Sequence, residues 1–189
     1  REVPLGPDFS LPMEEILRAA DAHTKVLWLC SPNNPTGNAF PLAELERLAE
    51  AFRGVVVVDE AYVDFSPKGS MLSVLDRHPN VVVLQTFSKA WGMAGLRLGM
   101  AFAHPEVAAL FAKVKHPYNV NGPTQQRVAD AIRKGLLGEV EEICAQRAWL
   151  AGELERVECV EKVFPTDANF FLFRTADADA LYGYLVDHG

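Results

Sequence analysis

The sequence predicts an α/β fold built on a mostly parallel sheet that is flanked by helices. Short apolar segments of strand length alternate with segments of helical periodicity through about residue 115. Residues 55–58 are four consecutive valines, and residues 81–83 are three more. Such runs are typical of strands buried on both faces, as in a parallel sheet covered by helices. Hydrophobic residues make up 49% of the 189 residues, which is enough apolar material for a core.

The first half of the chain is predicted to hold helices on either side of an apolar strand. Residues 25–30 (KVLWLC) form the strand, and residues 31–37 (SPNNPTG) form a loop because prolines and a glycine interrupt them. Leucine and alanine at helical spacing predict a helix from Pro41 to Phe52. Ser10 is a candidate N-cap for an earlier helix that runs to about His23.

The rest of the chain begins with the second valine-rich strand, at residues 81–87. The further elements expected are strands at 98–103 and 168–173 and helices at 105–115, 124–134, 139–158 and 177–188. Two long helical segments interrupt the alternation of strands and helices near residue 120. We therefore expect one domain over residues 1–120 and a second over residues 121–189.

Composition excludes several classes of partner. The net charge is −7, and no run rich in lysine or arginine appears, so we expect no nucleic acid or anionic membrane as a partner. No apolar stretch reaches the length of a membrane span. The cysteines Cys30, Cys144 and Cys159 are far apart and lack the spacing of a metal site. We therefore expect reduced thiols in a cytoplasmic protein and no bound metal.

Polar residues gather where the predicted strands end. Asn34 follows the first strand. Asp59 and Tyr62 follow the first valine run, and Lys89 follows the second. Each group alone is as consistent with a turn or a helix cap as with a site. In open α/β sheets, however, ligands bind at the carboxyl ends of the strands, so the three groups together favour a site.

The residue types in these groups predict the chemistry of pyridoxal phosphate. A lysine amine condenses with carbonyls to form Schiff bases, which fits Lys89. The hydroxyls of Thr86 and Ser88, together with Arg97, are groups that bind phosphate. A carboxylate such as Asp59 can hold the proton of a pyridinium nitrogen. Proteins that use pyridoxal phosphate supply both this acidic partner and the lysine.

Three segments resemble the fold-type I pyridoxal-phosphate aminotransferases of classes I and II in their order and spacing. They are SPNNPTG at 31–37, VVVVDEAYVDF at 55–65 and QTFSKAWGMAGLRLG at 85–99. The acidic and aromatic part DEAYVDF and the later HPYNVN look most like the histidinol-phosphate aminotransferases within this family. The resemblance implies the second half of the family's large α/β domain, followed by the start of its small α+β domain.

The resemblance implies a role for each residue around the cofactor ring. Asn34 would donate a hydrogen bond to the phenolate oxygen, and Tyr62 would share that oxygen. Asp59 would pair with the pyridinium nitrogen. Ala61 would pack beneath the ring, where a larger side chain would collide. Lys89 would form the covalent bond to the cofactor's aldehyde carbon.

The resemblance also implies a phosphate site and a catalytic cycle. Thr86, Ser88 and Arg97 would bind the cofactor's phosphate. Lys89, once the substrate amine has displaced it, would be the general base that moves a proton at the substrate's α-carbon. Asp59 would keep the ring nitrogen protonated so that the ring can accept electrons.

For the family resembled, the amino donor is L-histidinol phosphate and the acceptor is a 2-oxo acid such as 2-oxoglutarate. The resemblance implies a homodimer. It also implies further phosphate-binding and substrate-binding segments before residue 1 and after residue 189. We therefore expect the chain to be a fragment that lacks both ends and is an incomplete enzyme by itself.

Two other interpretations keep the same motifs. Another fold-type I enzyme, either an aromatic amino-acid aminotransferase or a threonine-phosphate decarboxylase, would use the same cofactor residues and differ in its substrate contacts. An aminotransferase-like regulatory domain would be attached to a DNA-binding module. Nothing basic in this sequence supports the second alternative.

Overall fold

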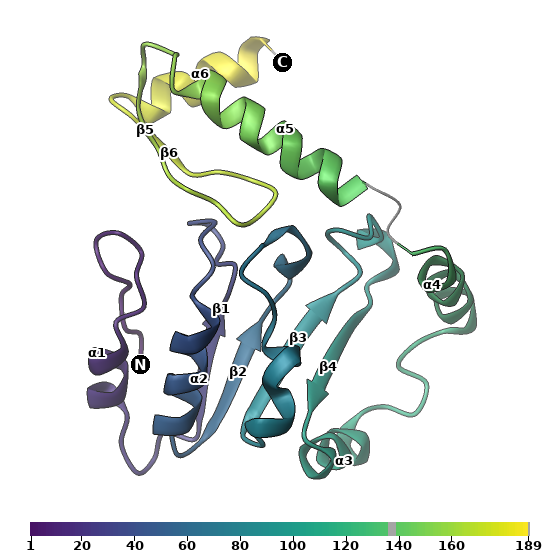
Figure 1. The fold of residues 1–189 in the computed structure, drawn as a ribbon. Helices are drawn as coiled ribbons and strands as arrows, with labels where there is room; N and C mark the ends of the chain where they lie inside the picture. The colour runs from purple at the N-terminus through teal and green to yellow at the C-terminus, as the bar shows by residue number, and fades with distance from the viewer. Residues whose placement is uncertain (136–138, 189) are drawn as a thin grey trace.

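The computed structural model describes residues 1–135 and 139–188, and it contains a four-stranded sheet flanked by helices (Figure 1). Across the sheet lie β1 (Val26–Cys30), β2 (Val55–Asp59), β3 (Val81–Thr86) and β4 (Gly99–Ala103), in that order. The first three strands are parallel, and β4 runs antiparallel to β3. The α/β fold with a mostly parallel sheet is therefore confirmed.

The register of the parallel strands brings their carboxyl ends to one edge of the sheet. Cys30 in β1 is the partner of Asp59 in β2, and Asp59 is the partner of Leu84 in β3. The loops that leave β1 and β2 therefore begin side by side. The backbone continues the pairing beyond β2, because Glu60 N donates to Leu84 O at 2.8 Å.

The core of the sheet is made by valines that are buried on both sides. Val56 and Val58 are 1% and 0% exposed and pack with Leu48, which is 0% exposed, in the main apolar cluster. Val57 and Val82 are also buried, at 7% and 2% exposed. The elements that cover the sheet include α1 (Met13–Ala19), α2 (Leu42–Ala51), the 3-10 helix η2 (Met71–Arg77) and α3 (Pro105–Val114). The run of valines thus predicts burial correctly for the central strands.

The edge strand β1 differs, because one of its faces is open. Val26 and Trp28 are 52% and 58% exposed, whereas Leu29 on the other face is 8% exposed. A hollow of about 730 Å³ lies beside this strand and is lined by apolar residues of β1 and of the N-terminal segment, among them Trp28 and Ile16. It is lined by neither Lys89 nor Tyr62.

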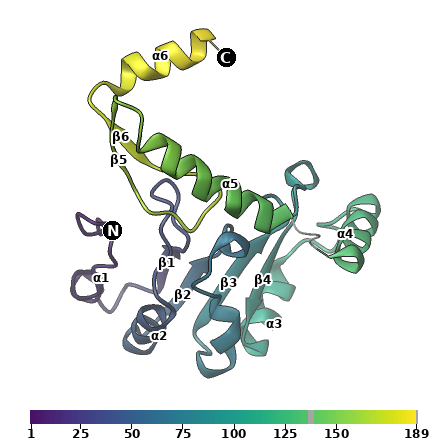
Figure 2. The same cartoon turned by 45° about the horizontal axis from the view of Figure 1, so that its top comes forward.

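The elements of the C-terminal part are α4 (Gly122–Lys134), α5 (Glu139–Leu154), β5 (Val160–Val163), β6 (Phe173–Thr175) and α6 (Ala178–His188). α4 lies beside the sheet on the β4 side, and the elements from α5 to α6 lie over the carboxyl ends of the parallel strands (Figures 1 and 2). β5 and β6 pair antiparallel in a separate two-stranded sheet. In both views the connection between β5 and β6 points toward the ends of β1 and β2. The domain boundary near residue 120 stays a prediction.

Several boundaries differ from those predicted. The first helix, expected to run to about His23, spans Met13–Ala19 with Pro12 at its N-cap and no side-chain cap, so Ser10 is not its N-cap. The helix expected at 139–158 ends at Leu154. The strand expected at 168–173 begins only at Phe173, and β5 was not predicted. The shift has a local cause, since Thr166 Oγ1 accepts from Ala168 N and donates to Phe170 O. These bonds hold residues 166–170 in a turn.

Among the described residues, no helix has the length and apolar character needed to cross a membrane. No group of three or more histidine, cysteine, aspartate or glutamate side chains in residues 1–135 and 139–188 is arranged to hold a metal ion.

Candidate active site

Asn34, Tyr62 and Lys89 meet at the carboxyl edge of the sheet. Asn34 Nδ2 donates to Tyr62 Oη at 3.4 Å, across 28 positions of sequence. Lys89 Nζ lies 5.0 Å from the centroid of the Tyr62 ring, within the range of a cation–π contact. Two residues that follow β1 and β3 therefore contact the phenol group of Tyr62, which follows β2.

Lys89 is presented by a turn that is anchored on both sides. Its side chain is exposed, while the neighbouring Phe87 and Ala90 are 2% and 8% exposed. Gly92 N donates to Lys89 O, and Met93 N donates to Phe87 O, both at 2.9 Å. None of the ion pairs found in the described part of the chain involves Lys89. The two backbone bonds fix the turn that carries Lys89, and its exposed side chain is accessible to a ligand.

Asp59 is the last residue of β2 and is in register with Cys30 of β1 and Leu84 of β3. Asp59 Oδ1 accepts from Ala61 N at 3.1 Å, which holds the turn that leads to Tyr62. Asp59 is half-buried, and so is Cys30, its partner in β1. Burial and the negative charge of Asp59 both raise the pKa of the Cys30 thiol, which keeps that cysteine neutral.

The hydroxyls of Thr86 and Ser88 form a pair at the end of β3. Thr86 Oγ1 donates to Ser88 Oγ at 3.0 Å and accepts from Ser88 N at 3.1 Å. Thr86 is the partner of Gly99 in β4, so Arg97 lies two residues before the strand that borders this pair. A phosphate site of hydroxyls, backbone amides and an arginine could form here.

The structure does not join Arg97 to the hydroxyl pair directly. Its guanidinium is exposed and donates to Ala94 O at 3.0 Å, and no hydrogen bond to Thr86 or Ser88 occurs among the described residues. Arg97 adopts a left-handed conformation with φ of 53°. Strained backbone at a residue other than glycine is concentrated at functional sites, so this conformation supports a role for the turn.

Glu60 directly follows β2, and its side chain connects the turn after β2 to η2 and to β3. The residue is 3% exposed. Its carboxylate accepts from Ser70 Oγ at 2.5 Å, from Met71 N at 2.7 Å and from Gln85 Nε2 at 3.0 Å. Burial raises the pKa of this carboxyl, and the three donors oppose that rise. Glu60 therefore holds the turn between Asp59 and Tyr62 against η2 and β3.

A smaller hollow of about 410 Å³ lies beside Lys89. It is lined by the turn at residues 89–93 and by residues of α4 and the start of α5, including Arg127 and Lys134. The larger hollow beside β1 is not lined by Lys89. We identify the site by its convergent polar residues and not by the volume of a hollow.

The chain belongs to the aminotransferase class I and II family, whose model matches residues 1–189. A curated histidinol-phosphate aminotransferase from Cytophaga hutchinsonii is 48% identical over 188 residues, which cover 98% of this chain and 54% of that protein. The chain thus spans about half the length of the curated relatives it matches.

Solved structures give the same fold. The histidinol-phosphate aminotransferase from Sinorhizobium meliloti in complex with pyridoxal-5'-phosphate has a TM-score of 0.81 and 25% identity, with 100% of this chain and 52% of that chain covered. The L-threonine-O-3-phosphate decarboxylase from Porphyromonas gingivalis has a TM-score of 0.76 and 26% identity, with 94% and 57% covered. These similarities confirm the expected fold-type I architecture.

Sequence reasoning placed the cluster at the right edge of the sheet but missed the residues that hold it. Phe170 packs edge-on against Tyr62, with ring centroids 5.1 Å apart. Asp167 accepts a hydrogen bond from Ala39 N, 128 positions away, and pairs with Lys68. No spacing or motif in the sequence indicates these contacts. The roles assigned to the eight predicted site residues stay predictions.

We expect Glu60→Ala to destabilise the protein by roughly 2–4 kcal/mol, since the change leaves the donors of Ser70, Met71 and Gln85 buried without their acceptor. Urea unfolding measures this free energy. Glu50→Ala, an exposed position on α2, is the control and should change stability by less than about 0.5 kcal/mol. Equal effects of the two substitutions would contradict the structural role of Glu60.

The raised pKa of Glu60 also determines the direction in which the free energy of unfolding changes with pH. Between the ordinary carboxyl pKa and the raised value, the folded state holds a proton that the unfolded state has lost. The contribution of this group to stability is therefore present below that window and is lost as pH rises through it. The difference in unfolding free energy between parent and Glu60→Ala should fall across the same window.

Proposed function

We propose that this chain supplies the lysine-bearing part of a pyridoxal-phosphate-dependent aminotransferase that uses L-histidinol phosphate as amino donor. The observation that carries the proposal is the meeting of Lys89, Tyr62 and Asn34, in which an amine that forms no ion pair within residues 1–135 and 139–188 lies 5.0 Å from a phenol ring whose oxygen accepts from an amide. A ligand that carries a carbonyl next to a phenolate needs an amine to bond with the carbonyl and hydrogen-bond donors to bind the phenolate. Lys89 can supply the amine, and Asn34 and Tyr62 can supply the donors.

The donor set fits pyridoxal phosphate. Asp59 has acceptor capacity beyond its bond to Ala61 N and could hold a pyridinium proton. Asn34 and Tyr62 carry N–H and O–H donors suited to a phenolate oxygen. The hydroxyl pair and the Arg97 guanidinium would hold the phosphate, and Ala61 would leave room for the ring. The solved relative from Sinorhizobium meliloti contains this cofactor, which supports the assignment.

Each side chain would then have a defined task. When bound, pyridoxal phosphate supplies an electron sink for negative charge at the substrate's α-carbon. Lys89 would hold the cofactor covalently, yield its place to the substrate amine, and then move the proton from the α-carbon as general base. Asp59 would hold the proton on the ring nitrogen. Tyr62 and Asn34 would orient the ring by their hydrogen bonds to its oxygen.

The substrate assignment is supported by the relatives. The protein from Cytophaga hutchinsonii, at 48% identity, is named for histidinol phosphate, and so is the solved relative from Sinorhizobium meliloti. We propose L-histidinol phosphate as amino donor and 2-oxoglutarate as acceptor for the whole protein. We further propose that it acts in the cytoplasm as a homodimer, as the family resemblance implies.

A second candidate is a decarboxylase of the same fold. The likeness to the L-threonine-O-3-phosphate decarboxylase from Porphyromonas gingivalis, at 26% identity, favours it as the alternative. The two reactions differ in the bond broken at the α-carbon, so their products separate them. Incubating the full-length gene product with O-phospho-L-threonine and measuring carbon dioxide tests the decarboxylase. Incubation with L-histidinol phosphate and 2-oxoglutarate, with glutamate measured, tests the aminotransferase.

We expect Lys89→Ala in the full-length gene product to lower kcat for glutamate formation by at least about 100-fold, because removal of a general base costs 10²–10⁴-fold as an order of magnitude. Lys113→Ala, an exposed lysine on α3, is the control and should keep the parent's rate. Retention of more than roughly a third of the parent's kcat by Lys89→Ala would refute the assigned base.

We expect Asp59→Asn to lower kcat by at least about tenfold, which corresponds to roughly 1.4 kcal/mol of transition-state stabilisation. The amide keeps the shape of the carboxyl but cannot hold the ring nitrogen in its charged form. The melting temperature should change little, because the bond to Ala61 N can be accepted by the amide oxygen. Asp76→Asn, at an exposed position, is the control. A rate within about threefold of the parent's would argue against the role of Asp59.

A further inference from the structure

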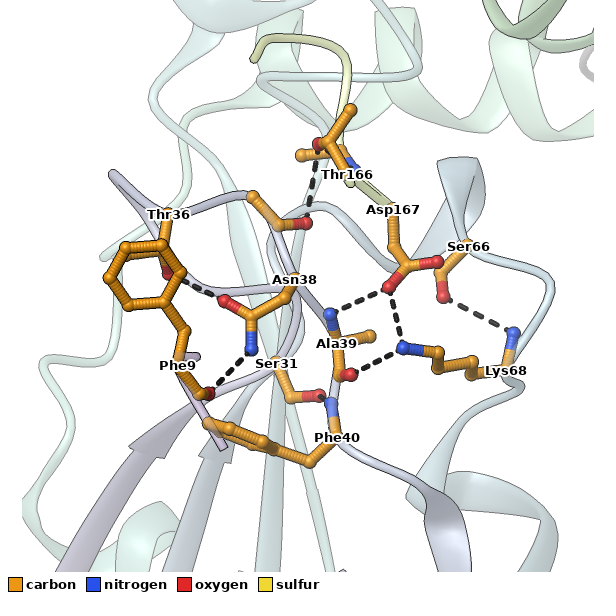
Figure 3. Close-up of polar contacts among 12 residues, drawn as sticks. Phe9, Ser31, Thr36, Asn38, Ala39, Phe40, Ser66, Lys68, Thr166 and Asp167 are labelled. Carbon is orange, nitrogen blue, oxygen red and sulfur yellow. Dashed lines mark hydrogen bonds and ion pairs between the residues drawn. The ribbon is translucent and has the colours of Figure 1, made fainter. Parts of the chain in front are cut away.

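The connection between β5 and β6 binds the loop that follows β1 (Figure 3). We call residues 164–170 the tether segment. Asp167 Oδ2 accepts from Ala39 N at 2.8 Å and lies 2.9 Å from Lys68 Nζ. Lys68 Nζ also donates to Ala39 O at 2.7 Å. Both backbone polar groups of Ala39 are therefore bound by this one ion pair.

The burial of these groups makes the contact specific. Ala39 is 6% exposed, and the side chain of Asp167 is 14% exposed, whereas that of Lys68 is 41% exposed. A carboxylate withdrawn from water is stabilised only when donors surround it. Without Asp167 the buried N–H of Ala39 would lose its acceptor. Lys68 can be changed at less cost to folding because it borders on water.

The tether segment also holds the same loop at Gly37, where residues 166 and 167 lie close to the glycine backbone. Asp167 N donates to Gly37 O at 2.8 Å, and Thr166 Oγ1, whose hydrogen is directed to Phe170 O, lies 3.3 Å from the same Gly37 oxygen. Gly37 has a φ of +81°, and a Cβ added there would collide with Thr166 Oγ1 and lie 2.9 Å from Thr166 Cβ. A glycine is required both by the conformation and by the contact.

The other end of the tether segment packs against Tyr62. The ring of Phe170 meets the Tyr62 ring edge-on, at 5.1 Å between centroids. Ala168 is fully buried, and its carbonyl accepts from Arg147 Nη1 at 2.6 Å. Arg147 Nη1 also donates to Phe65 O at 3.2 Å, three residues beyond Tyr62. The tether segment is therefore fixed to the Tyr62 side as firmly as to the loop.

The tether segment thus contacts both the loop that carries Asn34 and the Tyr62 ring. Asn34 lies in the loop at 31–40, which closes on itself through the bond from Gly37 N to Asn33 O at 2.7 Å. We propose that Lys68 and Asp167 are positioning residues, whose ion pair clamps this loop to the tether segment and so sets Asn34 against the Tyr62 hydroxyl. The inference rests on the proposed function, in which Asn34 and Tyr62 bind the cofactor's phenolate oxygen.

The first test needs no cofactor. Hydrogen–deuterium exchange of the full-length gene product, prepared free of cofactor, is followed in peptides that cover residues 33–40, 60–65 and 164–170. We expect Lys68→Met and Asp167→Ala to raise exchange in all three peptides by about tenfold at the protected amides. Exchange in α2 should not change. Lys68→Arg, which keeps the charge and the donors, should restore the parent's rates.

The second test reads the cofactor's environment. Donors to the phenolate oxygen favour its charged form, so displacing Asn34 should raise the pH midpoint of the visible absorbance of the pyridoxal-phosphate-loaded protein by roughly half a unit to one unit. Lys68→Met should show this rise and Lys68→Arg should not. Faster exchange without a shifted midpoint would overturn the positioning role, and unchanged exchange would overturn the clamp itself.

Two glycine variants distinguish loss of the contact between Gly37 and the tether segment from a general loss of stability. Gly37→Ala keeps both charges but places a methyl group against Thr166, so it should reproduce the effects of Lys68→Met. Gly69→Ala introduces a side chain at a similar φ of +83° with no atom within 4 Å, and should leave exchange in the tether segment unchanged. If the parent bound no pyridoxal phosphate, the proposed function would fail, while the exchange results would still decide whether the clamp exists.

Discussion

The whole site depends on the register of three parallel strands. Pairing of Cys30 with Asp59 and of Asp59 with Leu84 ends β1, β2 and β3 at a common edge. The valines of β2 and β3 are buried on both faces, whereas β1 buries Leu29 and leaves Val26 and Trp28 exposed, so a slip of β1 by one residue would bury its exposed face and expose its buried one. The register therefore brings residues that are far apart in sequence to one edge, where the bond from Asn34 to Tyr62 and the contact of Lys89 with the Tyr62 ring can form.

The loops that leave this edge are then fixed by buried polar contacts rather than by apolar packing. Glu60 binds the turn after β2 to η2 and β3. Asp167 binds the loop after β1 to the connection between β5 and β6. Both carboxylates are mostly withdrawn from water, so each is stable only while its donors are in place. These contacts connect the loops that carry Asn34 and Tyr62 to segments outside the cluster of Asn34, Tyr62 and Lys89.

The sequence predicts what is local and misses what is not. Valine runs indicate the buried strands, Asp59 directly follows the first run, and Lys89 follows the second after the strand end and a short turn, so both the sheet and the edge that carries the site are predictable. The strand expected at 168–173 is wrong because side-chain bonds within residues 166–170 outweigh the strand preference of its phenylalanines. The pair of Lys68 and Asp167 joins residues about a hundred positions apart, and only the folded chain brings them together.

The central claim is that Lys89 is the residue that bonds covalently to pyridoxal phosphate. The most direct measurement is borohydride reduction of the full-length gene product loaded with pyridoxal phosphate, followed by peptide mapping. The account predicts a single reduced adduct, on Lys89, with a stoichiometry near one per chain and none in Lys89→Ala. An adduct on another lysine, or equal labelling of Lys89→Ala, would contradict it.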